Sequence, residues 1–173
     1  CGICTLAFAT GVSAQKIGDD RPYEPIVMIG GNFPAFSSDT VSVDDVRVMR
    51  YDTALDTWSI VPFQIDQTGE GGFFAEHDNL ADDNDQYVMM ARDFGDQADP
   101  TNWPDDVNAR MYTRYEIAFL DPLNIFATGY LYVFRSSTID ISSMGSYMDY
   151  APAPIDMPVY ADTVKGTSYH QGG

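Results

Sequence analysis

Short segments in which apolar and polar residues alternate constrain the fold of this chain more than any other feature of its sequence. Within residues 111–119, Tyr115 and Ile117 would share one face of a strand, and Arg114 and Glu116 would share the other. This period of two is typical of an antiparallel strand that has one face in water. No segment sustains apolar residues at helical spacing over three turns. We therefore expect an all-β fold.

Turn residues separate the apolar runs at intervals that suit hairpins. Residues 129–134 are predicted to pair with the strand that precedes them, because the intervening segment 121–124 carries Asp, Pro and Asn. Residues 46–51 and 58–65 predict a second hairpin. Pro62 places its second arm at a sheet edge or a bulge, since proline cannot donate to the ladder. Two further short apolar runs lie at 26–29 and 86–91. Many short strands joined by such turns predict an antiparallel β-sandwich.

The start of the chain has the features of a secretory signal peptide. An apolar run at 3–9 is too short to span a membrane, and the small residues Val12 and Ala14 match the pattern that signal peptidase cuts. The alternative is a buried N-terminal strand. We expect residues 1–14 to be a remnant of the signal and residues 15–173 to form one sandwich domain. That domain is expected to be secreted, periplasmic or held at the cell surface, without a membrane span in the mature chain.

The cysteines and the end of the chain add two expectations. Both cysteines, Cys1 and Cys4, fall in the leader, so disulfides and thiolate metal sites are excluded from the mature domain. The chain closes at 169–173 without the pattern of a strand or helix end. We therefore expect a sandwich that is incomplete at one or both ends, with a truncation at the C-terminus.

The charge balance restricts the classes of partner. The chain holds 26 Asp and Glu against nine Lys and Arg, which gives a net charge of -17. Nucleic-acid binding depends on Lys and Arg contacts to phosphate, and no basic stripe is present. Nucleic acid is therefore excluded, and an extracellular glycan or protein is the expected partner.

Acidic residues are concentrated in one segment. Residues 78–85 hold four carboxylates and two carboxamides, and calcium takes about six to eight oxygen ligands in a flexible geometry. The sequence therefore predicts calcium as a cofactor, with a site formed by Asp78, Asp82, Asn84 and Asp85. The alternative is a solvated acidic loop in which Asp and Asn side chains cap turns through the backbone.

Other candidate site residues are few. Trp103 lies in a polar segment, where a tryptophan can stack on a sugar ring, so it is the candidate ligand-binding residue. The alternative is that Trp103 folds back over the core. His77 and His170 are too few and too separated for a multi-histidine metal centre. Catalytic residues stay unknown.

Two segments together resemble a known pattern. Residues 61–66 read Val-Pro-Phe-Gln-Ile-Asp, and residues 82–96 contain the run Asp-Gln-Tyr-Val-Met-Met-Ala-Arg-Asp-Phe-Gly-Asp. The pair is similar to uncharacterised secreted proteins of bacteria and archaea, in which a VPFQID strand precedes an acidic D-x-x-D-E-x-V-F-M-A-x-D-x-G-D block. The resemblance spans about residues 46–134 and implies a secreted β-rich domain, with no catalytic residue to carry over. A more distant likeness exists to β-rich domains attached to polysaccharide-degrading enzymes.

These features predict a secreted β-rich binding or structural module that calcium stabilises. The alternative is a fragment of a carbohydrate-active enzyme, either a polysaccharide hydrolase or a lyase. Such an enzyme would use two carboxylates, with Trp103 as a platform for the sugar.

Overall fold

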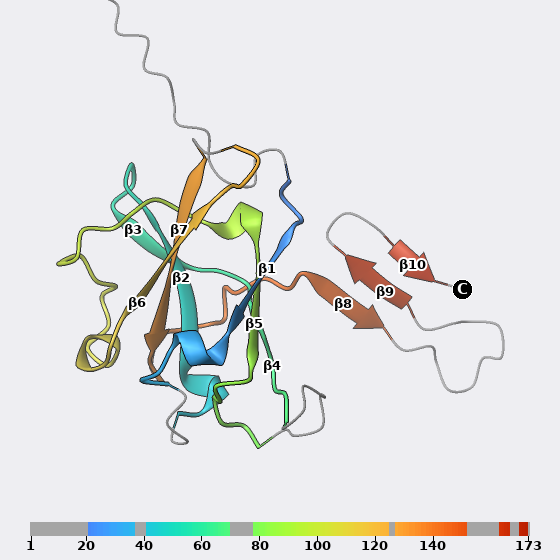
Figure 1. Cartoon of the computed structure of the whole chain (residues 1–173), viewed down its shortest axis with the longest axis horizontal. Helices are drawn as coiled ribbons and strands as arrows, with labels where there is room; N and C mark the ends of the chain where they lie inside the picture. The colour runs from blue at the N-terminus through green and yellow to red at the C-terminus, as the bar shows by residue number, and fades with distance from the viewer. Residues whose placement is uncertain are drawn as a thin grey trace, which may run out of the picture.

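The computed structural model describes residues 21–36, 41–69, 78–124, 127–151, 163–166 and 170–172. Within these residues the helices are single 3₁₀ turns, and none is long and apolar enough to cross a membrane. Seven strands form two antiparallel sheets, which pack against each other as the two layers of a sandwich (Figure 1). The prediction of an all-β, sandwich-like fold is confirmed.

The two layers differ in size. The larger sheet has the order β3-β2-β7-β6 and consists of Thr57–Ile60 (β3), Val46–Asp52 (β2), Thr128–Arg135 (β7) and Tyr115–Leu120 (β6). The smaller sheet has the order β1-β5-β4 and consists of Pro25–Ile29 (β1), Gln86–Met90 (β5) and Gln64–Asp66 (β4).

A separate antiparallel sheet joins Met148–Ala151 (β8), Thr163–Gly166 (β9) and His170–Gly172 (β10). The 3₁₀ turns are Gly30–Asn32 (η1), Val43–Asp45 (η2), Ala91–Asp93 (η3) and Ala109–Met111 (η4).

Both predicted hairpins are present, and one arm of each is shorter than the sequence suggests. β2 pairs with β3, and β6 pairs with β7. The second arm of the first hairpin ends at Ile60 because Pro62 has no N–H to extend the ladder, and the chain crosses to the other sheet as β4. β3 and β4 are each the outer strand of their sheet, so the predicted edge placement is confirmed. The strand predicted from residue 111 begins only at Tyr115, since η4 precedes it.

The main core lies between the two sheets. It is built from the alternate residues of β2, β7 and β5 that point inward, and it is closed by aromatic residues that follow β1. Its fully buried side chains include Val46, Val48, Leu131, Val133, Tyr87, Met89, Phe33 and Phe36.

A second apolar cluster covers the outer face of the larger sheet. Met49, Tyr51, Tyr132 and Phe134 are buried there, beneath the long segment that connects β5 to β6. Because both of its faces are covered, β2 is buried at every position from Val46 to Met49. The long connection therefore forms a third layer over this sheet.

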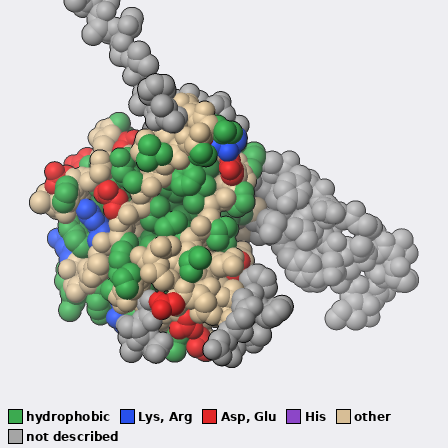
Figure 2. Space-filling view, in the orientation of Figure 1, with side chains coloured by type: hydrophobic (Ala, Val, Ile, Leu, Met, Phe, Trp, Pro, Cys, Tyr) green, Lys and Arg blue, Asp and Glu red, His purple; other side chains and the backbone are tan. Residues whose placement is uncertain are grey.

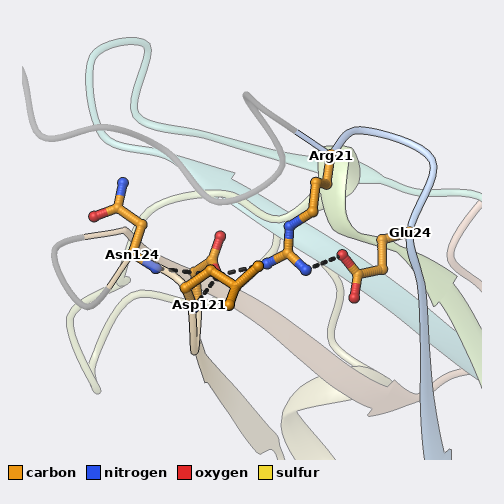
Figure 3. A network of polar contacts seen from close by, with 5 residues as sticks. Arg21, Glu24, Asp121 and Asn124 are labelled. Carbon is orange, nitrogen blue, oxygen red and sulfur yellow. Dashed lines mark hydrogen bonds and ion pairs between the residues drawn. The ribbon is translucent and has the colours of Figure 1, made fainter.

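Arg21 ties the start of β1 to the turn between β6 and β7 (Figure 3). Its guanidinium pairs with Glu24 Oε2 at 2.5 Å and donates from Nη2 to Asp121 Oδ1 at 2.5 Å. Asp121 Oδ1 also accepts hydrogen bonds from Leu123 N and Asn124 N, at 2.8 and 3.3 Å. The hydrogen bond from Arg21, followed by that from Leu123, lowers the pKa of Asp121. One end of the sandwich is thus held by a charged contact between its sheets.

Candidate functional site

The acidic segment 78–85 forms a loop in which Asp85 is the most buried of the four carboxylates. Asp85 Oδ1 accepts a hydrogen bond from Thr68 N at 3.1 Å, and Oδ2 accepts one from Asp82 N at 2.9 Å. Burial raises the pKa of Asp85, and the two N–H donors oppose part of that rise. Both carboxylate oxygens therefore hold the loop together.

The other predicted calcium ligands also make local contacts. Asp78 Oδ1 accepts from Leu80 N at 2.9 Å and from Gln67 Nε2 at 3.1 Å. Asn84 donates its side-chain amide to Thr68 O. Across the described ranges, no three His, Cys, Asp or Glu side chains come together as a metal-binding group. Calcium binding stays a prediction for the residues named above, which are Asp78, Asp82, Asn84 and Asp85.

Turn η1 packs directly against the backbone of this loop. Gly30 N donates to Asp85 O at 2.8 Å, and a Cβ on Gly30 would lie only 1.8 Å from Asp82 O. Glycine is therefore required for this close approach. The nearby Tyr87 hydroxyl is buried and has no hydrogen-bond partner among the described residues. Burial, followed by the charges of Asp85 and Asp82, raises the pKa of Tyr87.

Trp103, the predicted ligand-binding residue, is half-buried against the second apolar cluster. The centroid of its ring lies 5.9 Å from that of Phe134 at an interplanar angle of 59°. The guanidinium carbon of Arg114 lies 5.1 Å from the Trp103 ring centroid. These contacts correspond to the alternative in which the tryptophan folds back over the core. Its use as a sugar platform stays a prediction.

A hollow of about 240 Å³ is lined by the other tryptophan, Trp58, and by Asp106 and Asp140, among others. Asp106 Oδ2 accepts from Thr138 Oγ1 at 2.6 Å, and Oδ1 accepts from Ala109 N at 2.6 Å. Burial opposes ionisation of Asp106, but the hydrogen bonds outweigh it and lower its pKa. Hydrogen bonds likewise lower the pKa of Asp140. Both carboxylates are therefore suited to accept hydrogen bonds and not to act as general acids at neutral pH.

A second groove, of about 230 Å³, opens where η2 leads into β2. Its walls are mainly apolar, and they come from η2, the β3–β4 link, β4 and the segment after β7. Asp44 and Arg47 supply its polar groups. The apolar lining residues are Val43, Val46, Phe63, Ile65, Ile141 and Met144.

Arg47 is the most unusual of these lining residues, because it is a charged side chain that is only 7% exposed. Nε donates to Ile139 O at 3.1 Å, and Nη1 donates to Asp44 O at 2.5 Å and to Val46 O at 2.8 Å. In the described part of the chain it forms no ion pair, and Nη2 forms no hydrogen bond. Burial lowers the pKa of Arg47, and the charges of Asp45 and other carboxylates oppose this.

Sequence reasoning missed Arg47, although a signal for it was present. With a period of two, Arg47 shares a strand face with Met49 and Tyr51, both of which are buried. A charged residue in line with apolar neighbours indicates a buried polar contact.

Some predictions lie outside the described residues. They concern residues 1–14, with their two cysteines, and His77.

Comparison of the chain with models of protein families, with curated proteins and with solved structures gave no match.

Proposed function

We propose that this chain is a secreted β-sandwich binding module, with the groove beside Arg47 as its ligand site. The observation that carries the proposal is the Arg47 side chain, which is 7% exposed, lines the groove and keeps an Nη2 donor without a partner in the described residues. Tyr87 Oη is the only buried side-chain polar atom without a hydrogen bond among the described residues, so Arg47 Nη2 is accessible to solvent. A ligand in the groove could therefore reach it. A hydrogen-bond acceptor on a ligand would give Nη2 a partner.

The charges around Arg47 favour a neutral acceptor over an anion. Asp45, Asp44 and Asp106 all act on the guanidinium through Coulomb interactions, and the whole chain carries a net charge of -17. These carboxylates would repel an anion, whereas a carbonyl oxygen could accept from Nη2 without that cost.

The apolar walls of the groove define the rest of the ligand. Phe63, Ile65 and Met144 offer a surface that an aliphatic group can cover. A peptide segment carries a backbone carbonyl next to its side chain, so one aliphatic residue of a partner protein would supply both groups. We therefore infer a protein partner, bound through an exposed segment with an aliphatic side chain.

Titration with small probes, followed by heteronuclear NMR, tests this assignment. N-acetyl-leucinamide is neutral and presents a leucine side chain between two amides, while N-acetylleucine has the same side chain and a negative charge. We expect N-acetyl-leucinamide to shift the resonances of Val43, Ile65 and Met144, and N-acetylleucine to bind several-fold more weakly. Equal binding of the two probes would contradict the electrostatic part of the proposal.

A pair of matched variants makes the test specific to the groove. Ile141→Ser removes an apolar wall residue that is 43% exposed, and Leu123→Ser removes an aliphatic side chain that is 80% exposed elsewhere. We expect weaker binding of N-acetyl-leucinamide to Ile141→Ser and unchanged binding to Leu123→Ser. Binding that both variants preserve, or no shift in the groove at the solubility limit of the probe, would remove the site.

Glycan recognition is the second candidate, because the hollow at Asp106 places Trp58 beside carboxylate acceptors. Sugars use both kinds of contact, and the lowered pKa values of Asp106 and Asp140 support binding more than acid-catalysed cleavage. A polysaccharide panel assayed for both binding and turnover tests this candidate. Retention that is unchanged in Trp103→Ala would exclude the platform role that the sequence predicts for Trp103. Turnover that is lost in Asp106→Asn would favour the enzyme.

A further inference from the structure

Among the described residues, β6 has the longest unpaired strand edge of the sandwich. β6 is the last strand in the order β3-β2-β7-β6 and runs for six residues, against five, four and three for the other outer strands β1, β3 and β4. Unpaired strand edges present rows of backbone donors and acceptors that can pair with another chain.

The register shows which backbone groups of β6 are free. Asp121 N donates to Ala127 O at 3.0 Å, and the two residues are opposite one another in continuation of the β6–β7 ladder. In an antiparallel pair, alternate residues face the partner strand. Glu116, Ala118 and Leu120 therefore turn their N–H and C=O groups away from β7. All three residues are exposed, and none makes another backbone hydrogen bond within the described residues.

The neighbouring edge, that of β1, is protected by its sequence. Gly30 N and Glu24 O bond across to the β5 side, so Pro25, Val27 and Ile29 face outward. Pro25 has no N–H, and Ile29 N donates to Asn32 Oδ1 at 3.3 Å. β6 has neither a proline nor a lysine among its outward residues, and Glu116 is the one charged residue among them. The Leu120 side chain is 60% exposed.

We propose that this edge pairs with the same edge of a second copy of the chain. A two-fold axis at Ala118 would place Ala118 opposite its own copy and Glu116 opposite Leu120. The smallest side chain then lies on the axis, and the two Glu116 carboxylates do not face each other. The pairing is self-complementary, as a two-fold interface requires, and it would join two four-stranded sheets into one sheet of eight strands.

Figure 2 shows one face of the molecule, on which hydrophobic side chains gather toward the middle and acidic side chains lie mainly toward the rim. Charge opposes the association of two copies, because each copy carries a net charge of -17. Salt screens this repulsion. The dimer is therefore expected to strengthen as the salt concentration rises.

Sedimentation velocity at low and high NaCl tests the proposal, together with amide hydrogen exchange. We expect a monomer–dimer equilibrium that shifts toward the dimer with salt, and concentration-dependent protection of the Glu116, Ala118 and Leu120 amides. Ala118→Lys adds a charge on the axis, and Ala118→Pro removes the outward N–H without removing a bond to β7. Both are expected to give monomers.

Val107→Lys provides the matched control, because Val107 is 77% exposed on a different segment and the charge change is the same. It should dimerise at least as well as the unaltered chain. A chain that stays monomeric at every salt concentration overturns the proposal, as does a dimer that survives both Ala118 variants. Protection of the edge amides in a monomer that has captured a foreign peptide would also overturn it.

Discussion

Gly30 fixes the distance between turn η1 and the acidic loop. A Cβ at this position would lie 1.8 Å from Asp82 O, a backbone atom that cannot move aside as a side chain can. We expect Gly30→Ala to lower the free energy of unfolding by about 1–3 kcal/mol, as overpacking commonly does. Urea denaturation measures the change. Gly31→Ala is the control, since its Cβ would make an ordinary contact of 3.5 Å with Asp83 O; equal losses in both variants would contradict the explanation.

Asp106 makes stability depend on pH in a direction that its contacts determine. Hydrogen bonds from Thr138 and Ala109, opposed by burial, hold its folded pKa below the ordinary value of 3.8. The carboxylate therefore stabilises the fold above that value, and this contribution is lost as the pH falls through the lower, folded pKa. We expect Asp106→Asn to cost about 1–2 kcal/mol at neutral pH and to flatten the acid limb of the stability curve. The exposed Asp105→Asn should change neither quantity in denaturant titrations from pH 2 to 7.

At the scale of elements, the acidic loop is the place where calcium would act. Its carboxylates are held by backbone donors, and neighbouring like charges there would be relieved by a cation. We expect a higher melting midpoint in calcium than in chelator, with a gain of about 2.7 kcal/mol at a hundredfold excess over the dissociation constant. Asp78→Asn keeps an acceptor for Leu80 N and removes one charge, so it should reduce the calcium effect, whereas Asp105→Asn should leave it intact. Identical midpoints with calcium and chelator would dismiss the metal.

The elements themselves were predictable where local pattern decides them. Alternation in the Tyr115–Leu120 strand and the turn at Asp121 predict the β6–β7 hairpin, and Pro62 predicts the end of pairing near it. The second apolar cluster was not predictable, because Tyr132 and Phe134 are covered by a connection distant in sequence. The Arg47 groove was missed for the same reason: its walls come from segments that only the folded chain brings together.

At the scale of the whole molecule, the charge balance and the hydrogen-bonded contacts oppose each other. A net charge of -17 repels itself across a small sandwich. Local pairs such as Arg21 with Asp121 act in the other direction. Exposed pairs contribute little, so repulsion among the carboxylates, which outnumber the basic residues by 26 to nine, should dominate the response to ionic strength.

NaCl is therefore expected to raise the free energy of unfolding of this chain between low salt and 0.15 M, where the screening length falls to about 8 Å. The measurement is a urea titration at each salt concentration on Ala118→Lys, so that pairing at the β6 edge does not contribute. Glycerol at matched osmolality controls for preferential exclusion. Arg21→Gln, added to Ala118→Lys, removes the ion pairs of Arg21 with Glu24 and Asp121. The free energy of unfolding of the Arg21→Gln protein should rise more steeply with salt than that of Ala118→Lys alone, because it lacks a contact that salt weakens. A stability that falls with NaCl in both proteins would mean that attractive pairs, and not net repulsion, dominate the electrostatics of the fold.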